Sequence, residues 1–164
     1  MTTPPTGMRQ VVDWSAAIWA GLVAGLVFLL FNLFLTPVFA SGNAWVIIRL
    51  LASIVLGEGI LAPPATFNLA ALIVALLTNF VLSIAFSLLL AIIIHRWGLI
   101  VGIVGGALFG AALYAINFYS LTLLFPWFFA MRSWPIVISH IIFGAVAGGV
   151  YELLEVEEFV PVET

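Results

Sequence analysis

The feature that most constrains this chain is residues 99–127, which run without a single charged side chain. The stretch reads LIVGIVGGALFGAALYAINFYSLTLLFPW. Because about 20 apolar residues are enough to cross the hydrocarbon core of a bilayer, we predict a transmembrane helix over residues 99–126, with Trp127 as its interfacial anchor. Three glycines recur at every fourth position and share one face of this helix, where a second helix can approach closely: Gly102, Gly106 and Gly110.

The composition indicates that the whole chain lies in a membrane. Hydrophobic residues make up 65% of the 164 residues and charged residues 7%, whereas about a quarter of the residues of a soluble domain are charged. A chain of this length has room for roughly four spans, so we expect one membrane domain over residues 1–164, in contact with the lipid bilayer. The few cationic residues are scattered, which argues against nucleic acid as a partner. The lack of cysteine excludes disulfides and thiolate metal sites.

Three further apolar runs are long enough to be spans. We predict transmembrane helices over residues 14–40, 68–94 and 136–154. A polar lead, residues 1–12, precedes the first span, and an acidic tail, residues 155–164, follows the last. We expect the lead to be poorly ordered and the tail to be solvated. The predicted fold is therefore an all-α, integral membrane four-helix bundle.

Residues 44–61 are apolar but are interrupted by polar groups. Arg49, Ser53 and Gly57 recur every four residues and Glu58 follows, so the polar groups share one side of a helix. Because Arg49 and Glu58 would be costly at the membrane centre, the pattern favours an amphipathic helix lying in the interface over a fifth span. A re-entrant segment is the remaining alternative.

The first and third predicted spans repeat one pattern of small and polar residues. In each, two glycines are followed by an asparagine, and a proline comes near the end: Gly21, Gly25, Asn32 and Pro37 in the first, Gly106, Gly110, Asn117 and Pro126 in the third. The second and fourth spans correspond less closely, with Asn79 at the position of His140. We therefore expect two tandem transmembrane hairpins, with the interfacial helix inserted in the first.

Four polar side chains are predicted to lie at one depth. Asn32 and Asn117 come late in spans that run away from the N-terminal side, whereas Asn79 and His140 come early in spans that return. At a rise of about 1.5 Å per residue, all four fall in the half of the bundle away from the termini, and Tyr119 is close enough in sequence to join them. We call these five residues the polar layer.

The polar layer has two possible roles. Its side chains can hold the helices together by hydrogen bonds, or they can contact a ligand or substrate, as intramembrane ionisable residues often do. Glycines form the expected packing faces, because Gly144 and Gly148 follow His140 at four-residue steps and complete the set begun by Gly21, Gly25, Gly102, Gly106 and Gly110.

Six stretches of the sequence carry a resemblance to known proteins: DWSAAIWAGLVAG (13–25), VLGEGILAPPATFN (55–68), IIHR (93–96), INFY (116–119), FPWF (125–128) and SHIIFG (139–144). They resemble a family of small, uncharacterised four-span proteins of the bacterial inner membrane, some of whose members are labelled sodium:proline symporters. The last span is also remotely similar to the YagU-like membrane proteins. The resemblance implies a multi-pass protein of the bacterial cytoplasmic membrane and supplies no functional residue.

The sequence contains no pattern typical of a catalytic, metal or cofactor site. Carboxylate pairs are missing from the predicted spans, and G-x-S-x-G, H-E-x-x-H and Walker motifs do not occur. We therefore expect no enzyme and no resident cofactor. The favoured hypothesis is an accessory subunit that packs against other membrane subunits of a respiratory or photosynthetic assembly. The alternatives are a small homo-oligomeric channel or transporter that uses the polar layer, and a protein that binds a lipid, quinone or pigment.

The four arginines bear on the orientation of the chain in the membrane. Arg9 and Arg96 lie on the side of the termini, and Arg49 and Arg132 lie on the opposite side, so the positive-inside count is equal. Because Arg49 belongs to the interfacial helix and can be held there, we expect cytoplasmic termini.

Overall fold

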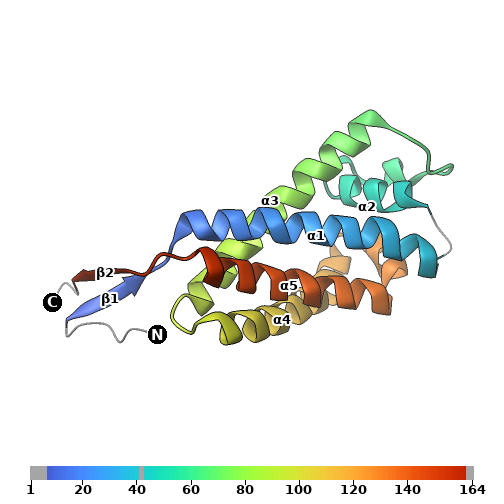
Figure 1. Ribbon diagram of the computed structural model, residues 1–164. Coiled ribbons are helices and arrows are strands. Elements are labelled where there is room, and N and C mark those ends of the chain that lie inside the picture. The colour runs from blue at the N-terminus through green and yellow to red at the C-terminus, as the bar shows by residue number, and fades with distance from the viewer. Residues whose placement is uncertain (1–6, 41–42, 162–164) are drawn as a thin grey trace.

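The structure, a computed structural model, describes residues 7–40 and 43–161 and is mostly helical (Figure 1). Within these residues, four helices are long and apolar enough to cross a membrane, which confirms that part of the expected fold. They are α1 (Trp14–Ala40), α3 (Leu69–Ile94), α4 (Leu99–Ala115) with its irregular continuation, and α5 (Trp134–Leu154). Parts of the expected polar lead and acidic tail lie outside the described residues, namely 1–6 and 162–164.

The third span is less regular than its apolar sequence predicts. The α-helix α4 ends at Ala115, and the chain continues as a π-helical turn, η2 (Ile116–Ser120), and a 3₁₀ turn, η3 (Leu121–Leu123). A further 3₁₀ helix, η4 (Pro126–Met131), then leads to α5. The expected span over residues 99–126 is therefore helical as far as Leu123, but only Leu99–Ala115 is regular α-helix.

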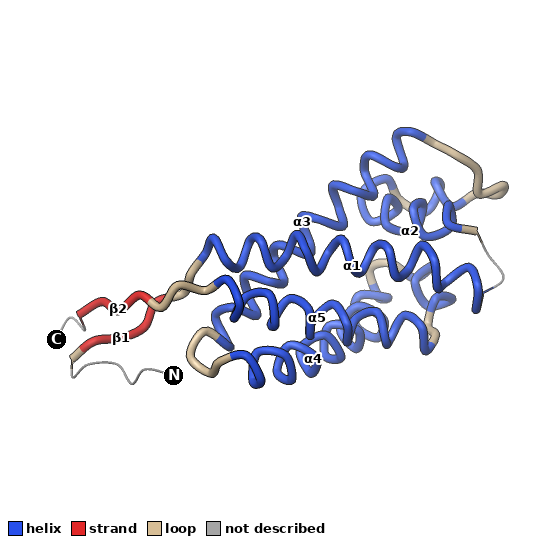
Figure 2. Tube along the Cα trace, in the orientation of Figure 1, coloured by secondary structure: helices blue, strands red, loops and turns tan. Residues whose placement is uncertain are grey.

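The long helices pack in the order α4, α5, α1, α3, so that the last helix of the chain lies between the third-span helix and the first. Helices α3 and α4 follow one another in sequence through a tight turn. They nevertheless contact each other only slightly, because they diverge from this turn toward the opposite end of the bundle (Figures 1 and 2).

Helices α4 and α5 touch backbone to backbone along a glycine seam. A methyl group built on Gly106 would meet the Gly144 carbonyl, and one built on Gly110 would meet the His140 carbonyl. In the other direction, methyl groups on Gly144 and Gly148 would meet the carbonyls of Gly106 and Gly102. These four positions require glycine because any side chain would force the helices apart.

Helices α1 and α3 form a second close contact. A Cβ built on Gly21 would lie 2.7 Å from the Ile84 Cα, and one built on Gly25 would lie 2.6 Å from the Ser83 Oγ. All seven glycines expected to pack helices therefore lie at contacts between helices.

Residues 44–61 form two short helices where one was expected. The first, α2 (Ala44–Leu56), begins at Asn43, whose side chain accepts a hydrogen bond from the Trp45 N–H, and ends at Gly57 with φ of 78°. The second is a 3₁₀ turn, η1 (Glu58–Leu61). Helix α2 packs mainly on α3, with five of its residues buried: Ile47, Ile48, Leu50, Ala52 and Ser53.

The chain ends add a short two-stranded sheet to the expected all-helical fold. Strand β1 (Met8–Val11) pairs antiparallel with β2 (Glu158–Pro161), and the pair extends from one end of the bundle (Figures 1 and 2). The expectation that the lead lacks order is wrong for the residues of β1. Pairing between segments at opposite ends of a chain leaves no local pattern, so the helical periodicity of the spans does not reveal it.

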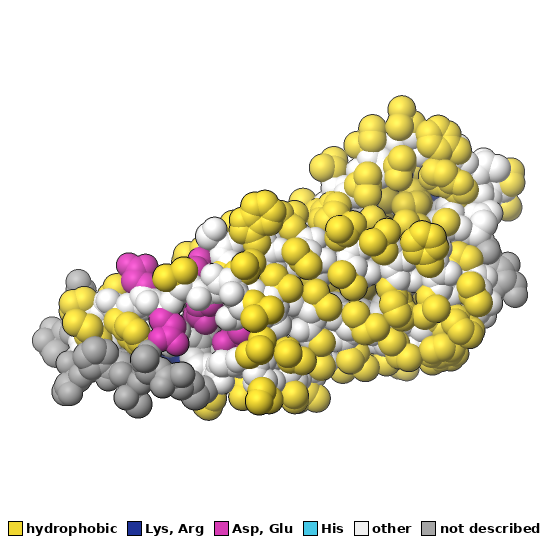
Figure 3. Space-filling model, viewed as in Figure 1, with side chains coloured by type: hydrophobic (Ala, Val, Ile, Leu, Met, Phe, Trp, Pro, Cys, Tyr) yellow, Lys and Arg dark blue, Asp and Glu magenta, His cyan; other side chains and the backbone are white. Residues whose placement is uncertain are grey.

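Asp13 connects the two ends of the chain next to this sheet. Its Oδ1 accepts the Ala16 N–H at 2.9 Å and so caps α1, and its Oδ2 accepts the Val156 N–H at 3.1 Å. The Tyr151 hydroxyl donates to Glu155 at 3.0 Å and accepts the Asp13 N–H at 3.3 Å. Acidic side chains gather at this end, whereas the rest of the visible surface is mostly apolar (Figure 3).

Candidate ligand cavity

A cavity of about 250 Å³ lies between two helical hairpins, of which one is formed by α1 and α3 and the other by the third span and α5. Its wall comprises residues from α1, α2, α3, α4, η2, η3, η4 and α5. Most of the wall is apolar, and six phenylalanines contribute to it: Phe28, Phe86, Phe118, Phe125, Phe128 and Phe143. The charged residues of the described chain are absent from the wall. A concave, mostly apolar site with a few polar groups is the usual form of a small-molecule binding site.

Four of the five polar-layer residues line this cavity: Asn32, Asn79, Asn117 and His140. Each of the four comes from a different long span, so the four residues that the sequence placed at one depth border a single cavity. Tyr119 does not line the cavity. It is 60% exposed, and its ring lies 4.1 Å from the Arg132 guanidinium carbon.

His140 is held in one tautomer by its neighbours. Its Nδ1 lies 2.8 Å from the Ile136 carbonyl oxygen, which can only accept a hydrogen bond, so Nδ1 carries a proton. In the neutral ring Nε2 is then an acceptor, and it faces the Asn117 Nδ2 at 3.4 Å. This proton assignment follows from the hydrogen-bond network. The contact with Asn117 is long for a hydrogen bond, for which about 2.9 Å is usual.

Aromatic rings surround the His140 side chain. The ring centroid of Phe28 lies 5.0 Å from that of the imidazole, and those of Tyr114 and Phe118 lie 5.7 Å away. All three rings meet the imidazole nearly edge-on, an arrangement that aromatic pairs favour. The imidazole is therefore fixed in an apolar setting and is itself buried.

The asparagines of the first hairpin bond to the backbone of α1. The Asn79 Nδ2 donates to the Gly25 carbonyl at 3.0 Å and so joins α3 to α1. The Asn32 Nδ2 donates to the Phe28 carbonyl at 2.9 Å, within its own helix. Asn79 therefore acts as one of the two roles considered for the polar layer predicts, because it holds two helices together by a hydrogen bond.

The π-helical turn η2 places Asn117 and Phe118 at the cavity. Such turns widen a helix by one residue and are frequent at functional sites. Arg132 stabilises this one, because its Nε donates to the Phe118 carbonyl at 2.7 Å and its Nη2 donates to the Thr122 Oγ1 at 3.4 Å. Sequence reasoning missed both the turn and the role of Arg132. The INFY segment offers no periodic signal for a π-turn.

Helix α2 also forms part of the cavity wall, which the sequence did not predict. Ile47, Leu50, Leu51 and Ile54 line the cavity, and Ser53 accepts a hydrogen bond from the Trp127 indole at 2.8 Å. This bond ties α2 to η4, and both elements contribute other residues to the cavity wall. The sequence signal that could have indicated this role is the set of apolar positions in residues 44–61, because it includes all four lining residues.

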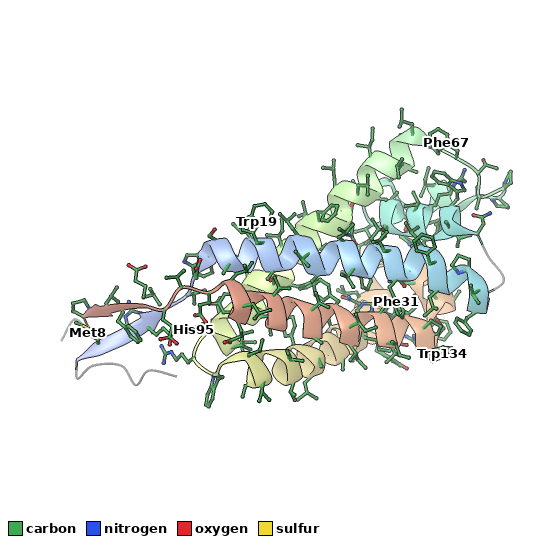
Figure 4. The ribbon with its side chains drawn as sticks, viewed as in Figure 1. Met8, Trp19, Phe31, Phe67, His95 and Trp134 are labelled. Atoms are coloured by element: carbon green, nitrogen blue, oxygen red, sulfur yellow. The ribbon has the colours of Figure 1, made fainter. Side chains whose placement is uncertain are left out.

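The second histidine lies far from this site. His95 is in the turn between α3 and α4, at the end of the bundle that carries the strands, whereas Trp134 lies at the opposite end (Figure 4). No group of three or more His, Asp or Glu side chains within residues 7–40 and 43–161 is arranged to hold a metal ion. The chemistry that the cavity offers is therefore hydrogen bonding and apolar contact.

Comparison with known proteins adds no relative. No protein-family model, curated protein or solved structure matches the chain.

Proposed function

We propose that this chain is a non-catalytic, multi-pass membrane protein that holds a neutral, lipid-soluble molecule in the cavity between its hairpins. The main support for this proposal is the chemistry of the cavity wall, which is apolar apart from a few uncharged amide, hydroxyl and imidazole groups. Such a site favours the binding of an apolar molecule that has a small polar head. Among the hypotheses drawn from the sequence, this supports the binding of a lipid, quinone or pigment.

The outer surface supports a membrane location. Large apolar side chains point outward along the long helices; Ile100 and Leu108 of α4, for example, are 79% and 69% exposed. Soluble proteins rarely expose contiguous apolar surface on this scale, whereas acyl chains would cover it favourably. We place the protein in the bacterial cytoplasmic membrane, following the resemblance of its sequence.

The arginines support cytoplasmic termini. Arg49 and Arg132 donate to backbone carbonyls at their end of the bundle, whereas Arg9 and Arg96 are exposed near the strands. Exposed arginines near the ends of spans are the ones that orient a protein by the positive-inside rule. A C-terminal reporter should therefore be active in the cytoplasm, and activity confined to the periplasm would contradict this orientation.

The same cavity argues against conduction. A channel needs a continuous path for water, but most of the wall is apolar and no charged side chain of the described residues lines it. The accessory-subunit hypothesis makes a different prediction, which is that other polypeptides copurify with the chain. It is compatible with a bound molecule, because a subunit of a larger assembly can also bind one.

Two substitutions on α4 test the proposed function. Leu113 lines the cavity and is buried, so Leu113→Trp should fill the cavity, whereas Leu108→Trp places the same side chain on the exposed side of the helix. We expect native mass spectrometry of protein extracted in mild detergent to show a bound neutral molecule in the parent and in Leu108→Trp, and much less in Leu113→Trp. Absence of a bound mass in all three, together with no uptake of added decylbenzene, would contradict the proposal.

A further inference from the structure

We infer that the molecule in the cavity is a carbonyl-bearing ring with an apolar chain, whose carbonyl accepts a hydrogen bond from Asn117 and whose chain leaves the bundle between α3 and α4. This inference rests on the proposed function and names the ligand class of the same cavity. Four features of the structure lead to it: the charge of the wall, the hydrogen bonds of the polar layer, the aromatic rings of the wall and the divergence of two helices.

The charge of the wall excludes ionised heads. Fatty acids and phospholipids would bring a carboxylate or a phosphate into a site whose described wall holds no Lys or Arg. Burying an unpaired charge is far more costly than burying a carbonyl that receives a hydrogen bond. The polar head that fits this wall is therefore uncharged.

The hydrogen bonds of the polar layer favour an acceptor. Asn117 has two N–H donors on Nδ2, and one of them meets His140 Nε2 only at 3.4 Å. A carbonyl oxygen placed at normal hydrogen-bond distance from Nδ2 would give this amide a better partner than the imidazole does.

The aromatic wall favours a flat head. Phe28 and Phe118 both line the cavity and stand edge-on to His140. A planar ring that enters beside them can make the offset or edge-to-face contacts that aromatic groups prefer. A carbonyl carried on a ring satisfies both the amide and these phenylalanines.

The chain of the ligand has an exit between α3 and α4. Both helices contribute to the cavity wall, through Leu82 and Phe86 on α3 and Leu113 on α4, yet they contact each other only slightly. Both helices also expose apolar side chains to the outside, Leu89 of α3 and Leu108 of α4 among them. An alkyl or prenyl chain leaving here would reach the surface that we assign to lipid.

Three probes of matched chain length test the ligand class on the full chain in lipid nanodiscs. Decylbenzoquinone has the ring, the carbonyls and the chain; decylbenzene lacks the carbonyls; decanoic acid carries a charge. One neutral hydrogen bond contributes about 1 kcal/mol, so we expect decylbenzoquinone to bind roughly fivefold more tightly than decylbenzene and decanoic acid to bind most weakly. Binding is measured by native mass spectrometry and corrected for uptake by empty nanodiscs.

Asn117→Leu should abolish the preference for the carbonyl probe. The matched control is Ser87→Ala, which removes a buried polar group of α3 that is not in the cavity wall, and which should keep the preference. If Asn117→Leu does not fold, infrared spectroscopy of the parent protein gives the same information, because a hydrogen-bonded quinone carbonyl absorbs at lower frequency than a free one.

The outcomes separate this inference from the proposed function. Binding of none of the probes would contradict the proposed function itself. Equal binding of decylbenzene and decylbenzoquinone, or an unshifted carbonyl band, would overturn the ligand class and leave the cavity proposal standing. A fourth probe, methylbenzoquinone, has the ring and the carbonyls without the long chain. Its binding without binding of decylbenzoquinone would overturn the exit between α3 and α4, because a closed cavity excludes the longer chain.

Discussion

Two adjacent glycines of α4 differ sharply in what surrounds them. A methyl group on Gly106 would collide with the Gly144 carbonyl, whereas one on Gly105 would find its nearest neighbour, the Ile94 Cγ2, at a comfortable 3.7 Å. The sequence predicted that Gly106 belongs to a packing face, because it shares four-residue spacing with Gly102 and Gly110. The identity of its partner, Gly144, required the structure.

We expect Gly106→Ala to destabilise the protein by roughly 2–3 kcal/mol, the usual cost of overpacking a closely packed contact. Gly105→Ala is the matched control and should be neutral or slightly stabilising, since alanine favours a helix by about 1 kcal/mol over glycine. The two variants are compared by thermal unfolding in mild detergent. Equal unfolding temperatures for Gly106→Ala and the parent would show that the seam is looser than described.

Asp13 predicts an acid-sensitive contact between the chain ends. The Ala16 N–H lowers the pKa of the Asp13 carboxyl most, partial burial opposes this effect, and the Val156 N–H lowers the pKa further. An acid with a lowered pKa stabilises the fold above its unfolded pKa, near 4, and loses that contribution as the pH falls through the folded value.

Hydrogen exchange at the Val156 amide should therefore rise, after correction for its intrinsic pH dependence, as the pH drops below about 4. In Asp13→Asn it should be fast at neutral pH already, because an amide has one acceptor oxygen where the carboxylate has two. Glu58→Gln, an exposed substitution in η1, is the control. Unchanged protection of Val156 in Asp13→Asn would contradict this account of the contact.

At the scale of elements, local sequence predicts regular helices and misses structure that depends on distant contacts. The expected span over residues 68–94 differs from α3 by one residue at its start, because its apolar run and the capping residue Asn68 are both local signals. The π-turn η2 depends instead on Arg132, which follows η4 in the sequence and donates a hydrogen bond back to the Phe118 carbonyl. The antiparallel strands likewise depend on residues from opposite ends of the chain.

Arg49 organises the segment between α2 and α3. Its guanidinium donates to the carbonyls of Ile60, Ala62 and Thr66 at 2.9–3.2 Å. The sequence placed Arg49 on the polar side of an interfacial helix, and the structure shows that this arginine joins the helix to the loop after it.

Replacing Arg49 with leucine should free this loop. Three carbonyls would lose their donors at once, so we expect opening of residues 57–66 to become easier by roughly 1–2 kcal/mol. That corresponds to faster amide exchange in the loop by about one order of magnitude. Arg96→Leu, which removes an exposed arginine, should leave exchange in this loop unchanged. Similar exchange in Arg49→Leu and the parent would mean that other contacts hold the loop.

At the scale of the whole molecule, the two hairpins make corresponding contacts. Gly25 of α1 faces Asn79 and Ser83 of α3, and Gly110 of α4 faces His140 and Gly144 of α5. These are the positions that the sequence comparison of the spans aligned. The corresponding asparagines, Asn32 and Asn117, both line the cavity.

The sequence could place four polar residues at one depth, but it could not show the space between them. A cavity depends on how the hairpins are spaced and on where α2 lies, and neither leaves a periodic signal. Tyr119 illustrates the limit, because it is two residues from Asn117 yet points away from the cavity.

The central claim is that the cavity is an apolar site reached from lipid, and spin-label accessibility in liposomes tests it most directly. Because the chain has no cysteine, a nitroxide can be attached at one introduced cysteine: Leu121 in the cavity wall, Leu108 on the outer face of α4, or Val156 near the strands. We predict that Leu121 resembles Leu108, with high accessibility to oxygen and low accessibility to a water-soluble nickel chelate, and that Val156 shows the reverse. High accessibility of Leu121 to the nickel chelate would mean that water fills the cavity, and would contradict the account in favour of a conducting path.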